Sequence, residues 1–210
     1  MYARMSSRAA RHPEVRTPPV PNLQGTMTEP RDVPTDIIAE LDEQGADLVR
    51  RAWRLAASAH EGQVRKDGSR VICHVIGVTR NVCRFAGRDA HLVAAALLHD
   101  VVENTPVTLV DLQSRFGDRI AGLVDAVTNR FGEDAAASAR RAQEAGDEAL
   151  LLRLCDRLDG IRCSPGRPPH RRRRFLEASR QVHLPLAEEH FPALAAEMRQ
   201  ALEEAEDALD

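Results

Sequence analysis

Residues 94–106 of this chain are A-A-A-L-L-H-D-V-V-E-N-T-P, and this stretch decides the expected fold. Every side of the segment before His99 is apolar, and a helix that is apolar all round packs inside a protein. Pro106 cannot continue a helix, because its ring removes the backbone N–H and clashes with the preceding turn. The stretch therefore predicts a central, buried helix over about residues 88–103.

A His-Asp pair, His99 and Asp100, lies at the end of this apolar segment. Burying an unpaired charged group is costly, and a divalent cation would satisfy both side chains at once. Glu103 follows His99 by four residues and Asn104 follows Asp100 by four, so each pair shares one face of a helix. The other interpretation is a surface pair near a helix C-terminus, where the helix dipole favours histidine. The dipeptide alone leaves both interpretations open.

Helical spacing extends on both sides of this stretch. Val49, Trp53 and Ala56 recur at intervals of three and four residues, as on one face of a helix. Residues 71–85 are rich in β-branched side chains, which favours a strand, but a lone strand among helices has no pairing partner, so we expect a helix there. Further helices are expected at about residues 109–116, 118–128, 147–161, 171–190 and 192–208. The predicted fold class is therefore all-α, a compact helical bundle.

The first 34 residues differ in composition from the rest of the chain. They contain six prolines and scattered arginines, with few large apolar residues. Such a segment cannot bury enough apolar surface to offset the entropy of ordering it. We therefore expect a disordered tail over residues 1–34 and one domain over residues 35–210.

Composition excludes several classes of partner. The net charge of −3 gives no general attraction to nucleic acid or to an anionic membrane, and the apolar runs are too short to span a bilayer. The N-terminus has no apolar segment of a secretion signal. Four cysteines, with no C-x-x-C pair, are typical of free thiols in a reducing compartment, so we expect a cytoplasmic protein. Nothing in the sequence indicates an oligomeric state.

The densest basic stretch is Arg171–Arg174. It is either an anion-binding patch or the solvated first turns of a helix. Because no aromatic residues for base stacking are interleaved with it, we expect the solvated helix.

Two further segments carry polar residues in a recognisable order. Residues 59–68 are A-H-E-G-Q-V-R-K-D-G, and His74 follows shortly after. Residues 152–162 are L-R-L-C-D-R-L-D-G-I-R, in which Asp156 is embedded in an apolar helical pattern. The chain thus has a histidine, a His-Asp pair and a distant aspartate on three separate predicted helices.

The order and approximate spacing of these segments resemble a known family. The chain resembles the hydrolase domain of RelA/SpoT-type alarmone enzymes and their stand-alone small alarmone hydrolases, which are HD-domain proteins. The family pattern is A-H-x-G-Q-x-R-K-x-G-x-x-Y-x-x-H-P, then L-L-H-D-x-x-E-D-T, then K-L-x-D-R-L-x-N-x-R. The likeness covers roughly residues 45–190.

The resemblance implies a metal-dependent phosphohydrolase with an HD-type helical bundle. One Mn²⁺, or another divalent metal, would be bound by His74, His99, Asp100 and Asp156. The substrate would be a small phosphorylated nucleotide, guanosine tetra- or pentaphosphate (ppGpp or pppGpp). Hydrolysis of its 3′-pyrophosphate would yield GDP or GTP and pyrophosphate.

The resemblance also implies roles for residues around the metal. Glu103 and Asn104 occupy the positions that act on the attacking water. Arg65 and Lys66 occupy positions where the family contacts its nucleotide, and Arg162 is a candidate phosphate clamp. Without the family pattern, Arg65 and Lys66 would be interpreted as a solvated turn.

Several family positions are altered in this chain. Asn104 replaces the second carboxylate of the E-D pair, and an amide cannot accept a proton. Gly160 replaces the usual asparagine, Val71 and His183 replace tyrosines, and Val75 replaces a proline. Three interpretations remain: slow alarmone hydrolysis, hydrolysis of another phosphorylated nucleotide, or binding of nucleotide without turnover.

Overall fold

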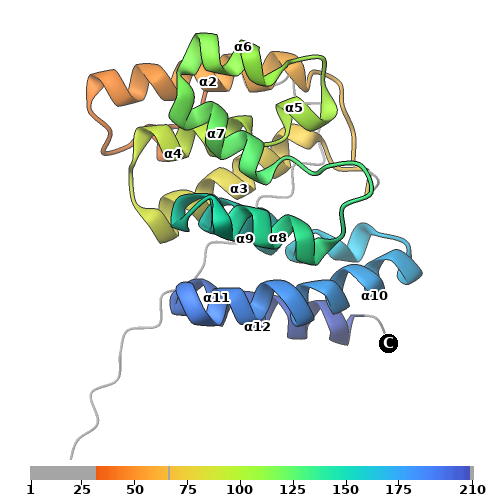
Figure 1. Ribbon diagram of the computed structural model, residues 1–210. Helices are drawn as coiled ribbons and strands as arrows, with labels where there is room; N and C mark the ends of the chain where they lie inside the picture. The colour runs from red at the N-terminus through yellow and green to blue at the C-terminus, as the bar shows by residue number, and fades with distance from the viewer. Residues whose placement is uncertain (1–31, 66, 209–210) are drawn as a thin grey trace, which may run out of the picture.

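Helices account for most of the computed structural model, which describes residues 32–65 and 67–208 (Figure 1). Over these residues the only β-type pairing is an isolated antiparallel bridge between Val64 and Arg70. The predicted all-α fold class is confirmed. Most of the predicted tail lies outside the described residues; within its last three residues, Val33 is buried and packs in the hydrophobic core.

The helices follow one another with short connections. Their bounds are α1 (Thr35–Ile38), α2 (Glu43–Ala59), α3 (Val71–Ala86), α4 (Ala90–Leu98), α5 (Val101–Asn104), α6 (Leu109–Phe116), α7 (Asp118–Val127), α8 (Ala135–Glu144), α9 (Asp147–Arg162), the 3₁₀ turn η1 (Ser164–Gly166), α10 (Pro169–Ala178), the π-helical turn η2 (Ser179–His183), α11 (Leu184–His190) and α12 (Pro192–Asp207). In Figure 1, α2 and α6 form one side of the bundle, α10, α11 and α12 form the opposite side, and α3 and α9 lie between them.

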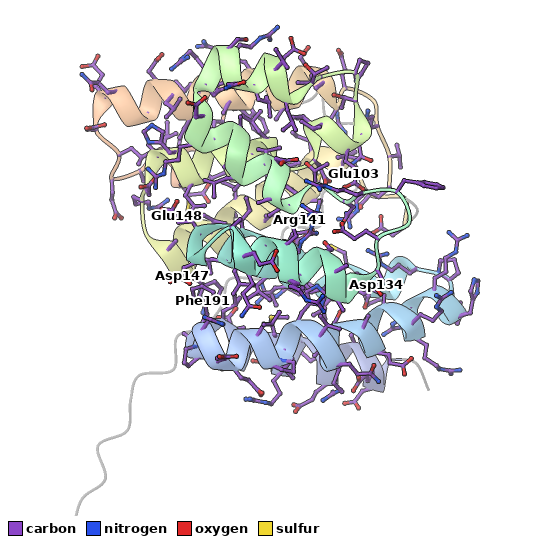
Figure 2. The ribbon with its side chains drawn as sticks, in the orientation of Figure 1. Glu103, Asp134, Arg141, Asp147, Glu148 and Phe191 are labelled. Carbon is purple, nitrogen blue, oxygen red and sulfur yellow. The ribbon has the colours of Figure 1, made fainter. Side chains whose placement is uncertain are left out.

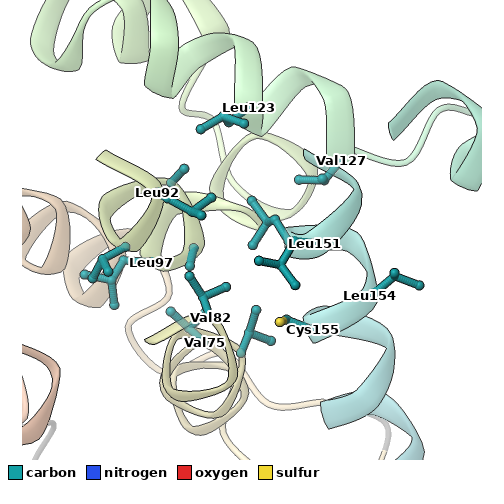
Figure 3. Close-up of a cluster of buried hydrophobic side chains, with 14 of the residues drawn as sticks. Val75, Val82, Leu92, Leu97, Leu123, Val127, Leu151, Leu154 and Cys155 are labelled. Carbon is teal, nitrogen blue, oxygen red and sulfur yellow. The ribbon is translucent and has the colours of Figure 1, made fainter. Parts of the chain in front are cut away.

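Helix α4 lies at the centre of the bundle, as the sequence predicts. All of its residues from Leu92 to Leu98 are buried, and it packs against α2, α3 and α7. Figure 3 shows apolar side chains of α3, α4, α7 and α9 meeting in one cluster, with Leu92 and Leu97 contributed by α4. The predicted helix does not run unbroken to residue 103, however, because His99 and Asp100 form a turn between α4 and α5.

Helix α3 confirms that packing overrides β-propensity in this segment. Val71, Val75, Val78 and Val82 are all buried, at the intervals of three and four residues that place side chains on one helix face. This face packs against α4 and α9. The β-branched residues thus fill the interior of a helical bundle.

Two parts of the helical pattern differ from the prediction. The expected single helix over residues 171–190 is divided by the π-helical turn η2 into α10 and α11. Helix α8 was not expected at all, because all of its apolar residues are alanines, which give no strong periodic signal. Its N-terminus is capped by Asp134, whose side chain accepts a hydrogen bond from the Ala137 N–H.

The basic stretch Arg171–Arg174 is solvated apart from one residue. Arg171, Arg173 and Arg174 are exposed, whereas Arg172 is 5% exposed and donates to the carbonyl oxygens of Ala205 and Ala208. These carbonyls belong to the last turn of α12 and its C-cap, where a cation is favoured by the helix dipole. The expectation of a fully solvated face was wrong at this one position.

Within the described part of the chain, no helix combines the length and apolar character needed to cross a bilayer. None of the four cysteines forms a disulfide with another described residue.

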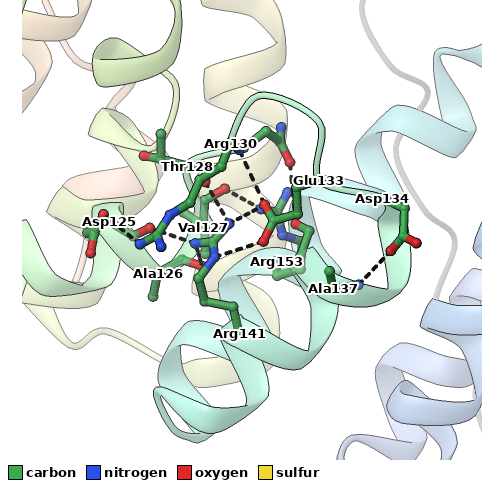
Figure 4. Close-up of polar contacts among 12 residues, drawn as sticks. Asp125, Ala126, Val127, Thr128, Arg130, Glu133, Asp134, Ala137, Arg141 and Arg153 are labelled. Atoms are coloured by element: carbon green, nitrogen blue, oxygen red, sulfur yellow. Dashed lines mark hydrogen bonds and ion pairs between the residues drawn. The ribbon is translucent and has the colours of Figure 1, made fainter.

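Arg141 of α8 organises the segment that follows α7 (Figure 4). Its guanidinium donates to the carbonyl oxygens of Asp125, Ala126 and Thr128 at 2.7–2.8 Å. It also forms an ion pair with Glu133 at 2.7 Å. One half-buried cation therefore satisfies three carbonyl groups around the C-terminus of α7.

We predict that Arg141→Met lowers the free energy of unfolding by about 3 kcal/mol, because several hydrogen bonds to a charged group are lost and their acceptors stay unpaired. Arg140→Met is the matched control, since Arg140 is exposed and has no side-chain hydrogen bond with any described residue. Urea denaturation of the metal-free proteins measures both. Equal losses in the two variants would contradict the role of Arg141.

Candidate metal centre

Three of the predicted metal ligands lie together although they come from separate elements. His74 belongs to α3, His99 follows α4, and Asp156 belongs to α9. Each offers one ligand atom, and these atoms all lie within 4.8 Å of one another. The two histidines are 5% and 4% exposed, and their rings meet edge to face at 5.3 Å between centroids.

Both imidazole rings are held at Nδ1. His74 Nδ1 donates to Asp159 Oδ2 at 2.5 Å, and His99 Nδ1 donates to the Ala96 carbonyl oxygen at 2.8 Å. Because Nδ1 is engaged as a donor, Nε2 is the nitrogen that can bind a cation in exchange for a proton, which is the usual arrangement of a metal-binding histidine. The Nε2 atom of His99 is buried and has no hydrogen-bond partner among the described residues. Such an unpaired polar atom is what a divalent cation would satisfy.

Two carboxylates lie beside the Nε2 atoms. Asp156 Oδ1 is 3.2 Å from His74 Nε2, and Arg153 donates to Asp156 Oδ2 at 3.3 Å. The Asp100 carboxylate is slightly farther, 3.8 Å from His74 Nε2 and 3.5 Å from His99 Nε2. The structure therefore brings together all four residues of the predicted quartet. Two imidazoles with carboxylates form a mixed donor set that suits manganese, iron or zinc.

The electrostatics of the cluster match this interpretation. Burial lowers the pKa of His74, but hydrogen bonds with Asp156 and Asp159 outweigh it and raise the pKa to about 10. Burial raises the pKa of Asp156, yet the hydrogen bond from His74 and nearby positive charge hold it well below its usual range. A proton on His74 thus balances the carboxylates, and a cation would take over that role.

Glu103 is held by a segment distant in sequence. Its Oε2 accepts hydrogen bonds from the backbone N and side-chain Nδ2 of Asn129, at 3.0 and 2.9 Å. Figure 2 labels Glu103 close to the segment that Arg141 organises. Asn104 is exposed, and its backbone carbonyl accepts from Gln63 Nε2 at 3.1 Å.

The predicted substrate-binding residues differ in their placement. Arg65 lies near the metal cluster, where its Nη1 is 3.7 Å from Asp159 Oδ2. Lys66 lies outside the described residues. Arg162 donates instead to Asn81 and Glu197, at 3.1 and 2.6 Å, and no interaction joins it to the cluster within the described residues.

Three residues near the site had no role assigned from the sequence. His60 is 1% exposed and donates from Nδ1 to Gln63 Oε1 at 2.9 Å, so the A-H-E-G-Q motif folds into a local hydrogen-bonded unit. Asp159 lies three residues after Asp156, a spacing that places both on one helix face. No sequence pattern links Asn129 to the site, because it contacts Glu103 from a loop that is distant in sequence.

Phe175 packs directly against one of the family departures, Gly160. A Cβ atom on Gly160 would lie 2.9 Å from Cζ of Phe175, so an asparagine there would collide with the ring. The guanidinium groups of Arg157 and Arg167 lie 4.4 and 4.2 Å from the centre of the same ring, within the range of cation–π contacts. Neither guanidinium has a hydrogen bond or ion pair with another described residue.

The departures at residues 71, 75 and 183 are buried, whereas Asn104 is exposed. Val71 and Val75 pack in the core, and His183 is fully buried in the π-helical turn. Burial, followed by the charge of Arg157, lowers the pKa of His183 to about 3, so its ring is neutral near pH 7.

Comparisons with known proteins agree on one family. A family model described as the HD domain matches residues 52–190. The chain is 31% identical over 151 residues to a guanosine-3′,5′-bis(diphosphate) 3′-pyrophosphohydrolase of Aquifex aeolicus (strain VF5), covering 69% of this chain and 22% of that protein. It is 33% identical over 159 residues to the bifunctional (p)ppGpp synthase/hydrolase SpoT of Escherichia coli (strain K12), covering 70% and 22%.

A solved structure of a metazoan ortholog of SpoT, which hydrolyzes ppGpp, superposes with a TM-score of 0.65 at 26% sequence identity. The match covers 75% of this chain and 94% of that one. By contrast, the chain spans only about a fifth of the length of the two relatives above.

We predict that His99→Ala abolishes stoichiometric binding of Mn²⁺, since it removes a buried donor that no neighbour can replace. Mn²⁺ at a hundred times its dissociation constant should stabilise the unaltered protein by about 2.7 kcal/mol and so raise its thermal midpoint. The thermal midpoint of His99→Ala should stay the same. His91→Ala, which alters an exposed histidine, is the control. Metal analysis that finds unaltered content in His99→Ala would show that the site is assigned wrongly.

Proposed function

Because this chain belongs to the HD-domain family, we propose that it is a metal-dependent phosphohydrolase that acts on ppGpp or pppGpp. Water would cleave the 3′-pyrophosphate group, giving GDP or GTP and free pyrophosphate. The observation that carries the proposal is the convergence of His74, His99, Asp100 and Asp156 on one buried cluster. The names of the relatives and of the structural neighbour support the choice of substrate.

The metal ligands in this proposal are the same four residues, and the proposed ion is Mn²⁺. When bound, the ion would supply Lewis acidity, which lowers the pKa of water and polarises a phosphoryl oxygen. His74 and His99 would offer their Nε2 atoms, since each Nδ1 is engaged elsewhere. Arg153, itself buried, holds the Asp156 carboxylate in place.

Glu103 is the proposed acceptor of the proton from the attacking water. Asn129 occupies Oε2 with two hydrogen bonds, and Oε1 has no partner within the described residues. One carboxylate oxygen is therefore fixed while the other is free to orient water and take its proton. Asn104 is the next residue in the chain. It would only orient water, because an amide cannot accept a proton.

Arg65 and Lys66 are the proposed nucleotide contacts. The Arg65 side chain is 16% exposed, and its buried Nη1 has no hydrogen bond with any residue that the structure describes. A guanidinium of this kind can donate to a phosphate oxygen. Arg162 would need to leave Asn81 and Glu197 to act as a phosphate clamp, so we assign the phosphate contacts to Arg65 first.

A specific observation favours a second candidate substrate, another phosphorylated nucleotide. Phe175 fills the space beside Gly160, and His183 is buried where the family has tyrosine. Because both positions depart from the family pattern, they favour a substrate other than the alarmone. A panel of guanine and adenine nucleotides with one to five phosphates separates the two candidates.

A cytoplasmic location is part of the proposal. The four cysteines support it, because they form no disulfide among the described residues and thiols stay reduced in such compartments.

We predict that the purified protein with Mn²⁺ releases pyrophosphate from ppGpp. Glu103→Gln should lower kcat by about 10²–10⁴-fold, the usual contribution of a general base, while the dissociation constant for Mn²⁺ stays the same. His99→Ala should show no turnover. If Glu103→Gln retained full kcat, the proton would have another acceptor; if no nucleotide were hydrolysed, the enzyme assignment would fail.

We also predict that Asn104→Asp raises kcat on ppGpp, because it restores a second carboxylate beside Glu103. The exposed position of Asn104 makes the change compatible with folding. Steady-state kinetics at saturating Mn²⁺ measures the effect. An unchanged or lower kcat would count against ppGpp as the substrate.

A further inference from the structure

The Asp159 carboxylate lies on the opposite side of the His74 ring from the metal cluster. It accepts from His74 Nδ1 at 2.5 Å, while His74 Nε2 lies 3.2 Å from the metal-ligand candidate Asp156. The two nitrogens of one imidazole point in different directions. Asp159 therefore contacts the ring nitrogen that points away from the cluster.

Gly77 makes room for this carboxylate. It lies in the middle of α3, one turn after His74, and glycine there costs helix stability relative to alanine. A Cβ atom on residue 77 would lie 2.9 Å from Asp159 Cγ and would overlap Oδ1 more severely. Any larger residue would displace the carboxylate from His74, so the glycine and the aspartate form a matched pair.

Two further groups hold the same carboxylate. Arg65 Nη1 lies 3.7 Å from Asp159 Oδ2, and the Cys163 thiol donates to that oxygen at 3.7 Å. The Asp159 side chain is 13% exposed. Its charge is thus balanced by Arg65, which is also the proposed nucleotide contact, and its orientation is restricted on several sides.

We propose that Asp159 is a positioning residue that fixes the tautomer and ring orientation of His74 for metal binding, and that Gly77 is the residue that permits it. The inference rests on the metal site of the proposed function. A carboxylate that accepts from the second nitrogen of a metal-binding histidine orients the ring and raises its basicity. In this chain the backbone Ala96 carbonyl serves His99 in the same way.

A double-mutant cycle tests the pairing. Isothermal titration with Mn²⁺ alone, without nucleotide, is carried out on Asp159→Ala, Gly77→Ala and the double variant. Each single change should raise the dissociation constant about 10–100-fold, the usual effect of losing such a partner. Because the alanine at 77 acts only by displacing Asp159, the double variant should match Asp159→Ala within about threefold, and all variants should still bind one ion.

Two controls separate positioning from folding. Gly122→Ala, in α7, changes a helical glycine with open space around it and should leave the dissociation constant for Mn²⁺ unaltered. Asp159→Asn keeps an acceptor oxygen for His74 and should restore part of the affinity lost in Asp159→Ala. The metal-free proteins should all unfold cooperatively in urea, with the double variant no less stable than Asp159→Ala.

Each contrary result has a distinct meaning. The positioning role would be overturned, and the metal site kept, if Gly77→Ala bound Mn²⁺ with unchanged affinity. The same holds if the losses of Mn²⁺ affinity in the two single variants added up in the double variant. Complete loss of the ion in Asp159→Ala, with no recovery in Asp159→Asn, would make Asp159 a ligand and overturn the inference. Absence of Mn²⁺ binding by the unaltered protein would overturn the metal site itself, and the inference with it.

Discussion

Desolvation of two imidazole rings beside carboxylates is the constraint on which the rest of this structure depends. His74, in the first turn of α3, and His99, directly after the apolar helix α4, are almost fully buried, and unpaired polar atoms are costly there. Each ring is therefore hydrogen-bonded at Nδ1, and each Nε2 lies beside Asp156 or Asp100. The surrounding helices provide both the low-polarity environment and the partners. A cation in the cluster would replace the proton that now balances the carboxylates.

The parts of this arrangement that the sequence predicts are those with a local pattern. The all-apolar segment before His99 predicts a central helix, and the spacing of valines in α3 fits a helix face once a lone strand is rejected. The motifs at residues 59–68, 94–106 and 152–162 identify the four ligand candidates by their resemblance to a family.

The parts that the sequence did not predict depend on contacts between distant residues. A turn at His99 and Asp100 interrupts the helix at the point where both side chains join the cluster. The spacing of apolar residues does not predict this turn. Arg172 belongs to a run of four arginines, and only the position of the end of α12 distinguishes it from its neighbours. The pairs Asp159 with Gly77 and Phe175 with Gly160 join different elements, so neither residue of a pair explains the other until the fold is known.

The central claim is that two histidines from different elements bind one metal ion through Nε2. Electron spin-echo spectroscopy of the Mn²⁺-loaded protein, prepared with ¹⁵N-labelled histidine, detects imidazole nitrogens bonded directly to the ion. Binding by His74 and His99 through Nε2 predicts coupling to two histidine nitrogens per Mn²⁺. Coupling to none, or to a single nitrogen, would contradict it.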